Sequence, residues 1–101
     1  MSLLKPVFYY AAPTTGQTIT LPSFDGDRLK VFIDPAGTLL ALTVTLPTAI
    51  DGQTIAIGTT QAITTLTMTG GTIIAALTTL AIGGFGEWGY SATANKWLRI
   101  S

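Results

Sequence analysis

The feature that most constrains this fold is a regular alternation of aliphatic and threonine side chains between Thr38 and Gly71. It is clearest in Leu42–Leu46, Thr54–Ile57 and Leu66–Thr69. Successive side chains of a strand point to opposite faces, so this period of two puts aliphatic residues on one face and threonines on the other. The segment therefore predicts three short strands, each with one buried and one hydroxyl-rich face.

The turn signals between these strands recur upstream. Leu46-Pro47 is followed by Asp51-Gly52 and then by the next strand, and Leu21-Pro22 is followed in the same way by Asp25-Gly26. Proline lacks the N–H that a ladder needs and an Asp-Gly pair tolerates positive φ, so both interrupt strand pairing. We interpret the pattern as a duplicated two-strand unit of about two dozen residues.

A second recurrence does not fit this spacing. The tetrapeptide Gly-Gln-Thr-Ile occurs at Gly16–Ile19 and again at Gly52–Ile55, displaced relative to the duplicated unit. The similarity is therefore one of pattern more than of strict register. The alternative explanation for both recurrences is composition, because threonine-rich strands with glycine-containing turns resemble one another.

Further strands are expected on both sides of the central three. Residues Thr72–Ile82 favour one or two strands because they are rich in β-branched residues, although a helix is the alternative since 73–77 contains no helix breaker. Asn95 tolerates a left-handed backbone and predicts a hairpin loop at Ser91–Asn95. About nine short strands predict an all-β, single-domain antiparallel β-sandwich of jelly-roll type. The remaining expected strands are Val7–Tyr10, Gln17–Leu21, Arg28–Ile33, Phe85–Tyr90 and Lys96–Ile100.

Composition limits the partners. The 101 residues include five basic and five acidic side chains, and the mean hydropathy is positive. Phosphate binding needs clustered positive charge, so nucleic acid is not expected as a partner. Low charge leaves little repulsion between copies, which predicts a homo-oligomer or a larger assembly, with a monomer of hydroxyl-rich surface as the alternative. We expect one domain, with an N-terminal arm over 1–16 and a β body over 17–101.

The sequence also predicts no membrane association. The apolar run Thr72–Ile82 is too short for a transmembrane helix and is interrupted by threonines. Residues Met1–Pro6 lack the basic start and apolar block of a signal peptide. We therefore expect synthesis in a cytoplasm.

Catalytic chemistry is restricted because the chain has no histidine and no cysteine. Their absence removes catalytic triads, histidine acid–base chemistry and typical zinc sites. The aspartates lie in turns beside glycine or proline, where their ordinary role is to hydrogen-bond the backbone. Asp25-Gly26-Asp27 resembles part of a calcium loop but lacks the further ligands. We expect no enzyme activity, no metal site and no cofactor. Paired carboxylates are the one remaining catalytic option, and the acidic residues available are Asp25, Asp27, Asp34, Asp51 and Glu87.

Two groups of residues are candidates for partner binding. In the strand Arg28–Ile33, the period of two places Arg28, Lys30 and Phe32 on the outer face, which can meet an acidic partner. The alternative is an edge strand protected from aggregation by its positive side chains. Phe8, Tyr9 and Tyr10 cannot all face one side of a strand. Either Phe8 and Tyr10 are buried in an edge strand with Tyr9 outward, or the arm crosses a neighbouring molecule.

A third aromatic group lies in the C-terminal hairpin. Trp88, Tyr90 and Trp97 can form a platform that stacks on sugar rings, but such a cluster is more often part of a core. Gly86 and Gly89 leave room for a large ring to lie across the strand. A flat threonine array that orders ice is disfavoured by the uneven spacing of the Thr-x-Thr pairs.

The strand and turn pattern of the last two thirds of the chain resembles a module of tailed-phage virion proteins. Those proteins include small capsid-decoration proteins and the end domains of tail fibres. The resemblance rests on patterning and on the closing Trp-x-Arg-Ile, and it implies an all-β, trimeric particle protein without enzyme activity. The matching stretches are Thr43–Pro47, Asp51–Ile55, Ile63–Thr69, Gly70–Ile73, Phe85–Tyr90 and Asn95–Ile100.

We therefore expect a capsid decoration (cement) protein that binds the outside of a phage head. Its expected partner is the major capsid protein or another virion protein. The chain shows no fibre shaft, heptads or collagen-like repeat, so a decoration role fits better than a fibre tip. A tail-fibre or carbohydrate-binding module is the alternative. The expected contacts are Phe8, Tyr9 and Tyr10 of the arm and Arg28, Lys30 and Phe32 of the strand face.

Overall fold

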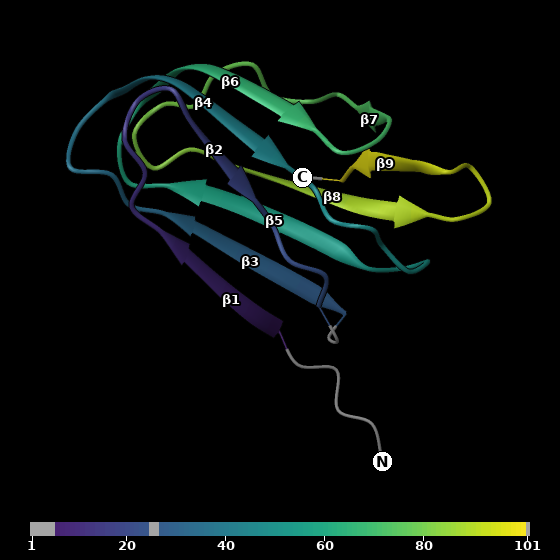
Figure 1. Ribbon diagram of the computed structural model, residues 1–101. Helices are drawn as coiled ribbons and strands as arrows, with labels where there is room; N and C mark the ends of the chain where they lie inside the picture. The colour runs from purple at the N-terminus through teal and green to yellow at the C-terminus, as the bar shows by residue number, and fades with distance from the viewer. Residues whose placement is uncertain (1–5, 25–26, 101) are drawn as a thin grey trace.

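A computed structural model describes residues 6–24 and 27–100, which form nine strands in two sheets (Figure 1). This part of the chain contains no helix that could span a membrane. The all-β class and the nine strands are as predicted. The strands are β1 (Pro6–Ala11), β2 (Gln17–Thr20), β3 (Arg28–Ile33), β4 (Leu39–Thr45), β5 (Thr54–Thr59), β6 (Ile63–Thr69), β7 (Ile73–Ile74), β8 (Phe85–Ser91) and β9 (Lys96–Arg99).

The chain passes back and forth between the two sheets. Sheet A has the strand order β1-β3-β5-β8-β9-β7, and sheet B has the order β2-β4-β6. The neighbours among β1 to β6 all pair in parallel. One odd-numbered strand and the even-numbered strand after it therefore form a coil, and three coils stack in the manner of a short β-solenoid (Figure 1).

The duplicated unit predicted from the sequence has the length of one coil, but it runs from the second strand of one coil to the first strand of the next. Pairing offsets the first two coils by 22 residues in sheet A (Val7 with Leu29) and by 25 in sheet B (Ile19 with Val44), and Leu29 pairs with Ile55 at an offset of 26. The structure adds a third copy, in which Thr45 pairs with Thr69. This copy is hidden in the sequence because Gly70 takes the place of the leucine in the Leu-Pro signal.

The parallel pairing of these six strands differs from the antiparallel jelly roll expected from the sequence. Alternation identifies the buried face of a strand but is the same for either strand direction. Consecutive strands here lie in opposite sheets instead of forming hairpins with each other. Antiparallel pairing is confined to β5–β8 and β8–β9 among the named strands. The hairpin between β8 and β9 is as predicted, with Asn95 at φ 56°.

The core lies between the two sheets and is closed at one end by the C-terminal segment. Trp88 and Trp97 are the largest fully buried side chains. Residues Thr72–Ile82 form β7 and an isolated bridge from Leu80 to Ile63, so the strand prediction is confirmed and the helical alternative is wrong. Other nearly inaccessible side chains are Leu29, Ile33, Leu42, Val44, Ile55, Ile57 and Ile63.

The recurring Gly-Gln-Thr-Ile reflects a repeated turn, and it does not follow the repeat of the coils. Gly16 and Gly52 have φ of 81° and 89°, a left-handed conformation that glycine adopts without steric cost. In the second turn the Ile50 N–H donates to Gln53 Oε1 at 2.9 Å, and the Gln53 N–H donates back to the Ile50 carbonyl at 3.0 Å. Gln17 makes the same pair of bonds with the residue three positions before it. The displaced register follows because these turns lie at different corners of the stack.

Gly70 should not tolerate a side chain. A Cβ there would collide with the Leu46 carbonyl oxygen and lie 2.7 Å from its amide nitrogen, and φ is +101°. We expect Gly70→Ala to lower the free energy of unfolding by about 2 kcal/mol or more, measured by urea denaturation. Gly37→Ala is the matched control, because its Cβ meets nothing within 4 Å. Equal stability of the two variants would contradict the close approach of the coils at Gly70.

Candidate partner-binding surface

The register of sheet A lines up aromatic side chains on the face that points away from sheet B. Tyr10 pairs with Phe32, Phe32 with Gly58, and Gly58 with Phe85, so one row crosses four strands. Phe8 lies two residues from Tyr10 on the same face of β1. Their exposed fractions range from 48% for Phe32 to 68% for Phe8. We call these four side chains the aromatic face: Phe8, Tyr10, Phe32 and Phe85.

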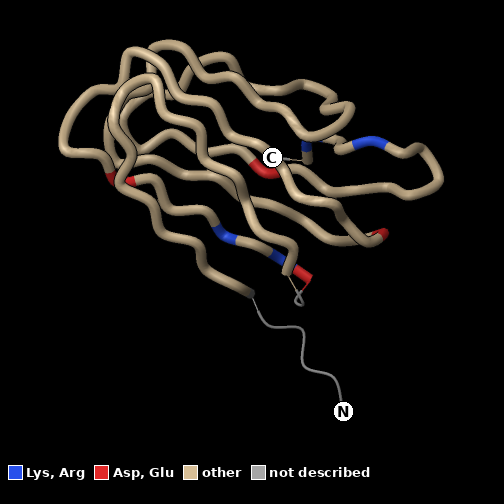
Figure 2. Tube along the Cα trace, viewed as in Figure 1, with Lys and Arg blue, Asp and Glu red and all other residues tan. Residues whose placement is uncertain are grey.

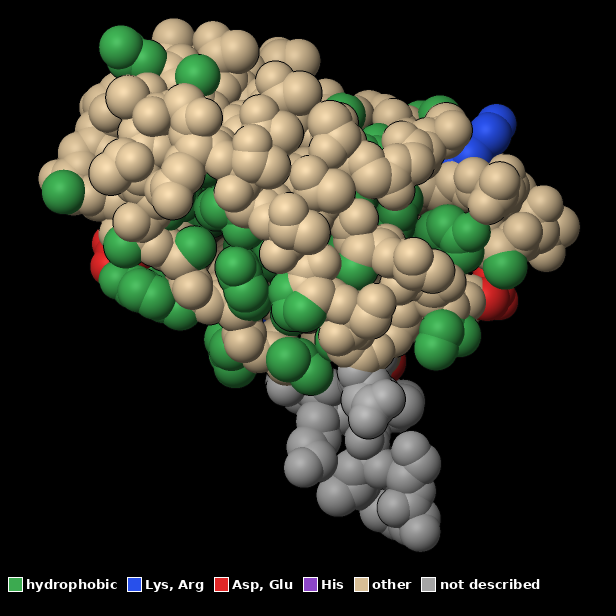
Figure 3. Space-filling view, viewed as in Figure 1, with side chains coloured by type: hydrophobic (Ala, Val, Ile, Leu, Met, Phe, Trp, Pro, Cys, Tyr) green, Lys and Arg blue, Asp and Glu red, His purple; other side chains and the backbone are tan. Residues whose placement is uncertain are grey.

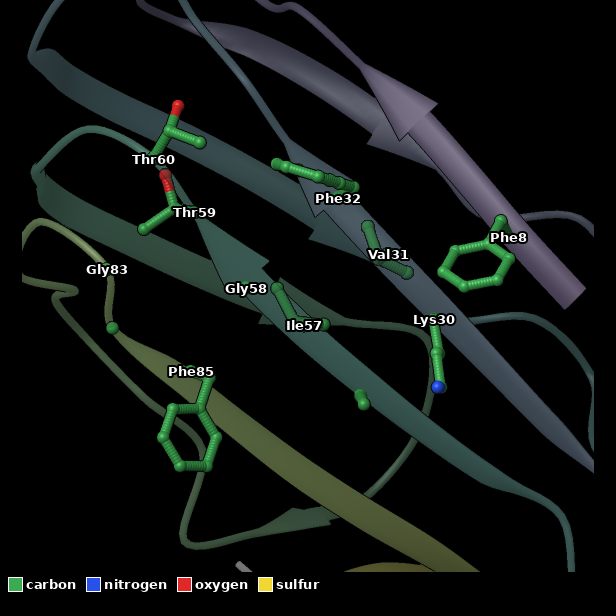
Figure 4. Close-up of a pocket in the computed structure, with 12 residues that line it drawn as sticks. Phe8, Lys30, Val31, Phe32, Ile57, Gly58, Thr59, Thr60, Gly83 and Phe85 are labelled. Atoms are coloured by element: carbon green, nitrogen blue, oxygen red, sulfur yellow. The ribbon is translucent and has the colours of Figure 1, made fainter. Parts of the chain in front are cut away.

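A groove of about 350 Å³ runs along the aromatic face (Figure 4). Gly58 contributes no side chain to its floor, and Phe32 and Phe85 lie on the two sides of that glycine. The two phenylalanines are two strands apart, so their Cα atoms are separated by about 10 Å. Gly83 and Gly84 line the groove further along. This arrangement leaves a shallow apolar trough that can receive side chains of a partner.

The charged groups on this face are tied to neighbours. Lys30 Nζ lies 5.3 Å from the centroid of the Phe8 ring, a cation–π distance. Arg28 forms an ion pair with Glu87 at 2.7 Å that crosses over β5. The Arg28 side chain is 41% exposed, so the pair contributes at most about 1 kcal/mol. Sheet B carries no charged side chain on its strands (Figure 2).

One end of the row is held by Asp34. The Tyr10 hydroxyl donates to Asp34 Oδ2 at 2.8 Å, and the Thr60 hydroxyl donates to Asp34 Oδ1 at 2.7 Å. The bonds from Thr60 and Tyr10 hold the pKa of Asp34 below its ordinary value. The hydrogen bond to Asp34 raises the pKa of Tyr10, because the carboxylate accepts the hydroxyl proton and so stabilises the protonated form of the tyrosine. Asp34 therefore links the first, second and third coils at their shared corner.

Most of the expected contact residues do lie together. Phe8, Tyr10, Arg28, Lys30 and Phe32 project from neighbouring strands on the outer side of sheet A, consistent with the burial patterns of β1 and β3. β3 lies between β1 and β5, so its interpretation as an edge strand is wrong.

The first strand differs from its prediction in which side chains it buries. Its position at the edge of the chain's own sheet is confirmed. Tyr9 packs against the core, whereas Phe8 and Tyr10 are exposed, the reverse of the expected orientation. The reason is register, because Tyr9 pairs with the buried Val31. Residues 6–11 of the expected arm thus belong to sheet A.

Phe85 was not identified as a contact residue from the sequence. The signal was present, because Trp88 is buried and the period of two then places Phe85 outward. The sequence did not show which strand lies beside Phe85. Phe85 joins the aromatic row because it pairs with Gly58, which is 27 positions away in the sequence.

The aromatic cluster of the C-terminal hairpin belongs to the core. Trp88 and Trp97 are 0% and 2% exposed. The Tyr90 ring packs on Trp97 at 5.2 Å between centroids, tilted by 59°. A Cβ at Gly86 would lie 2.7 Å from the Trp88 ring, so this glycine makes room for a tryptophan of its own strand. Burial leaves the two tryptophans no exposed ring face on which a sugar could stack.

Of the carboxylates that the structure describes, those of Asp34, Asp51 and Glu87 make structural contacts. Asp51 Oδ1 accepts the Ala92 N–H at 2.7 Å, and Glu87 is paired with Arg28. Within residues 6–24 and 27–100, no three His, Cys, Asp or Glu side chains gather in a way that could hold a metal ion. Asp25 and Gly26 of the possible calcium-loop fragment lie outside the described residues.

No known family, curated protein or solved structure matches this chain.

The bonds to Asp34 predict a specific acid dependence. Because the folded-state pKa lies below the ordinary value of 3.8, their stabilisation is complete above that pH and is lost as the pH falls through the folded pKa. We expect Asp34→Asn to lose less stability than the wild type as the pH falls below about 4, because only the wild type has a carboxylate whose hydrogen bonds are lost on protonation. Thr60→Val, which removes one donor, should have an intermediate slope. Identical acid dependence in all three proteins would contradict this role of Asp34.

Proposed function

We propose that this chain is a non-enzymatic structural protein of a tailed-phage virion. In this proposal it acts as a decoration (cement) protein that binds the outside of the head through the aromatic face of sheet A. The observation that carries the docking role is the exposure of Phe8, Tyr10, Phe32 and Phe85 in one register of the sheet. The virion setting is supported by the resemblance of the last two thirds of the chain to phage particle modules.

The size of the aromatic face supports a docking role. An aromatic side chain buries 150–250 Å² when fully enclosed, so four that are 48–68% exposed leave on the order of 500 Å² accessible. Patches of that size are at the upper end of what soluble monomers expose and often mark interaction sites. One partner of a standard interface contributes about 800 Å², so this patch can supply the apolar centre of such a contact.

The chemistry of the face indicates the kind of partner surface that fits it. The groove over Gly58 accepts apolar side chains, and Lys30 beside it can meet a carboxylate. Arg28 is already paired with Glu87, which leaves Lys30 as the cation better placed for a partner. The matching surface on a capsid protein is therefore apolar with an acidic residue at its margin.

A cement protein stabilises a shell without forming or breaking bonds. Each copy buries apolar surface across neighbouring capsid subunits, and many copies act together on the lattice. A stack of hydrogen-bonded coils suits that role because its outer face is held rigidly by strands. Modest affinity per copy is then enough for high occupancy.

The virion assignment is tested on purified particles. We expect the chain to be present in many copies in phage particles purified on a density gradient. The particles would come from lysates of the bacterial strain that carries the gene. Mass spectrometry would detect it, and gold-labelled antibody would place it on heads. Its absence from purified particles, or labelling of tails alone, would overturn the decoration role.

The docking surface is tested by substitution on the aromatic face. We expect Phe32→Ser combined with Phe85→Ser to lower occupancy on shells that lack the wild-type protein at least tenfold. Both rings are exposed, so the melting temperature should change little. Leu40→Ser is the matched control, since Leu40 is 67% exposed but belongs to sheet B. Full occupancy of the double variant would contradict docking through the aromatic face.

A further inference from the structure

The stack of coils is covered at one end and open at the other. Beyond β5, sheet A continues into β8 and β9. Beyond β6, the Leu66 N–H donates to the Thr78 carbonyl at 2.8 Å, and Ile63 bridges to Leu80. At the opposite end, β1 and β2 are the outermost strands of the described chain (Figure 1). The first coil therefore has a free edge in each sheet.

The core is also accessible at this open end. A hollow of about 190 Å³ lies between the first two strands, lined by Tyr9 and Ala11 of β1 and by Ile19 of β2 among others. Figure 3 shows hydrophobic side chains along the side of the molecule where β1 and β3 lie, whereas the surface over sheet B is mostly polar. In the part of the chain that the structure describes, the first coil thus lacks the cover that the C-terminal segment gives to the third.

The free edge of β1 presents unpaired backbone groups. The Asp34 N–H donates to the Ala11 carbonyl at 2.8 Å, so the backbone groups of Ala11 point toward β3. In a parallel pair the groups of alternate residues point to alternate sides, so those of Tyr9 also face β3. The N–H and C=O groups of Phe8 and Tyr10 therefore point outward along the edge.

Within residues 6–24 and 27–100, this edge carries none of the usual protection against pairing. Exposed edge strands are normally blocked by charged side chains, central prolines or bulges. β1 has the sequence Pro-Val-Phe-Tyr-Tyr-Ala, with its proline at the first position and no charge, and β2 has no charge either. A six-residue strand whose four central residues, Val7–Tyr10, are β-prone and which lacks these devices is suited to receive another strand.

We infer that β1 pairs with the β1 strand of a second copy, antiparallel and about a two-fold axis. The register that uses the outward groups places Tyr9 opposite the partner's Tyr9. Phe8 then faces the partner's Tyr10, and each such pair exchanges two backbone hydrogen bonds. The side chains of Phe8 and Tyr10 lie on one face of the strand, so the pairing also creates aromatic cross-strand contacts.

A second copy of the chain fits this edge. Each copy has one such open end, so two copies can cover each other's open ends. At the other end of sheet A the edge strand is β7, which has only two residues and cannot match a six-residue strand. Head-to-tail stacking into a fibre is thereby disfavoured, and identical open ends can only meet in a closed dimer. The described strands β1 and β2 carry no charged side chain, so no like charges oppose each other along the paired strands.

The first test uses the wild-type protein in solution. Light scattering across a concentration series should show a dimer, and hydrogen exchange followed by NMR should show the Phe8 and Tyr10 amides protected to the degree of the Tyr9 and Ala11 amides. A monomer at every concentration would overturn the inference. So would any oligomer, including a trimer, in which the Phe8 and Tyr10 amides exchange rapidly. No virion component is involved, so the result is independent of the decoration role.

The second test separates backbone pairing from side-chain contact. Phe8→Pro and Phe8→Ala both remove the ring, but only proline also removes the outward N–H. We expect Phe8→Pro to raise the dimer dissociation constant at least 100-fold and Phe8→Ala to raise it less than tenfold. Equal weakening, or a Phe8→Pro dimer as tight as the wild type, would overturn strand pairing. Circular dichroism checks folding, and Tyr10→Pro with Tyr10→Ala repeats the comparison if Phe8→Pro unfolds.

Discussion

Parallel stacking of coils in near-constant register is the constraint on which the rest of this structure depends. Each coil sets equivalent residues above one another, so Ile19 lies beside Val44 and Leu29 beside Ile55 in continuous aliphatic rows. The same stacking lets the hydroxyls of Thr45 and Thr69 hydrogen-bond at 2.9 Å on the opposite face of sheet B. Burial and backbone pairing are thus satisfied by one geometric repeat. Where the repeat needs a closer approach of two coils, glycine replaces leucine at position 70.

The candidate surface is a consequence of that stacking. Residues that are far apart in the sequence but equivalent in the coils form rows across sheet A, and one such row holds Tyr10, Phe32 and, through Gly58, Phe85. The corner residues follow the same logic, because Asp34 of one coil accepts hydrogen bonds from Tyr10 before it and Thr60 after it. A solenoid therefore turns widely spaced aromatic residues into a single apolar face without any loop.

The sequence was sufficient for the strands and for much of the face, but not for strand direction. The period of two located β3 to the residue and placed Arg28, Lys30 and Phe32 on its outer side. It could not orient β1, because three consecutive aromatics satisfy either orientation equally. Strand direction was missed although a repeat of about two dozen residues was visible. Neighbouring strands at that spacing leave room for a crossing to the second sheet, which is what parallel pairing requires.

This small domain has two separate surfaces for making contacts, the aromatic face of sheet A and the open edge at β1. The C-terminal end is closed by the hairpin with Trp88 and Trp97, whereas the first coil leaves its backbone free. Docking through the aromatic face uses side chains, and pairing through β1 uses the backbone, so one does not exclude the other. A two-fold axis perpendicular to sheet A keeps both aromatic faces on the same side of the dimer. Joining two chains at β1 would then double the apolar surface offered to a lattice and convert weak single contacts into avid binding.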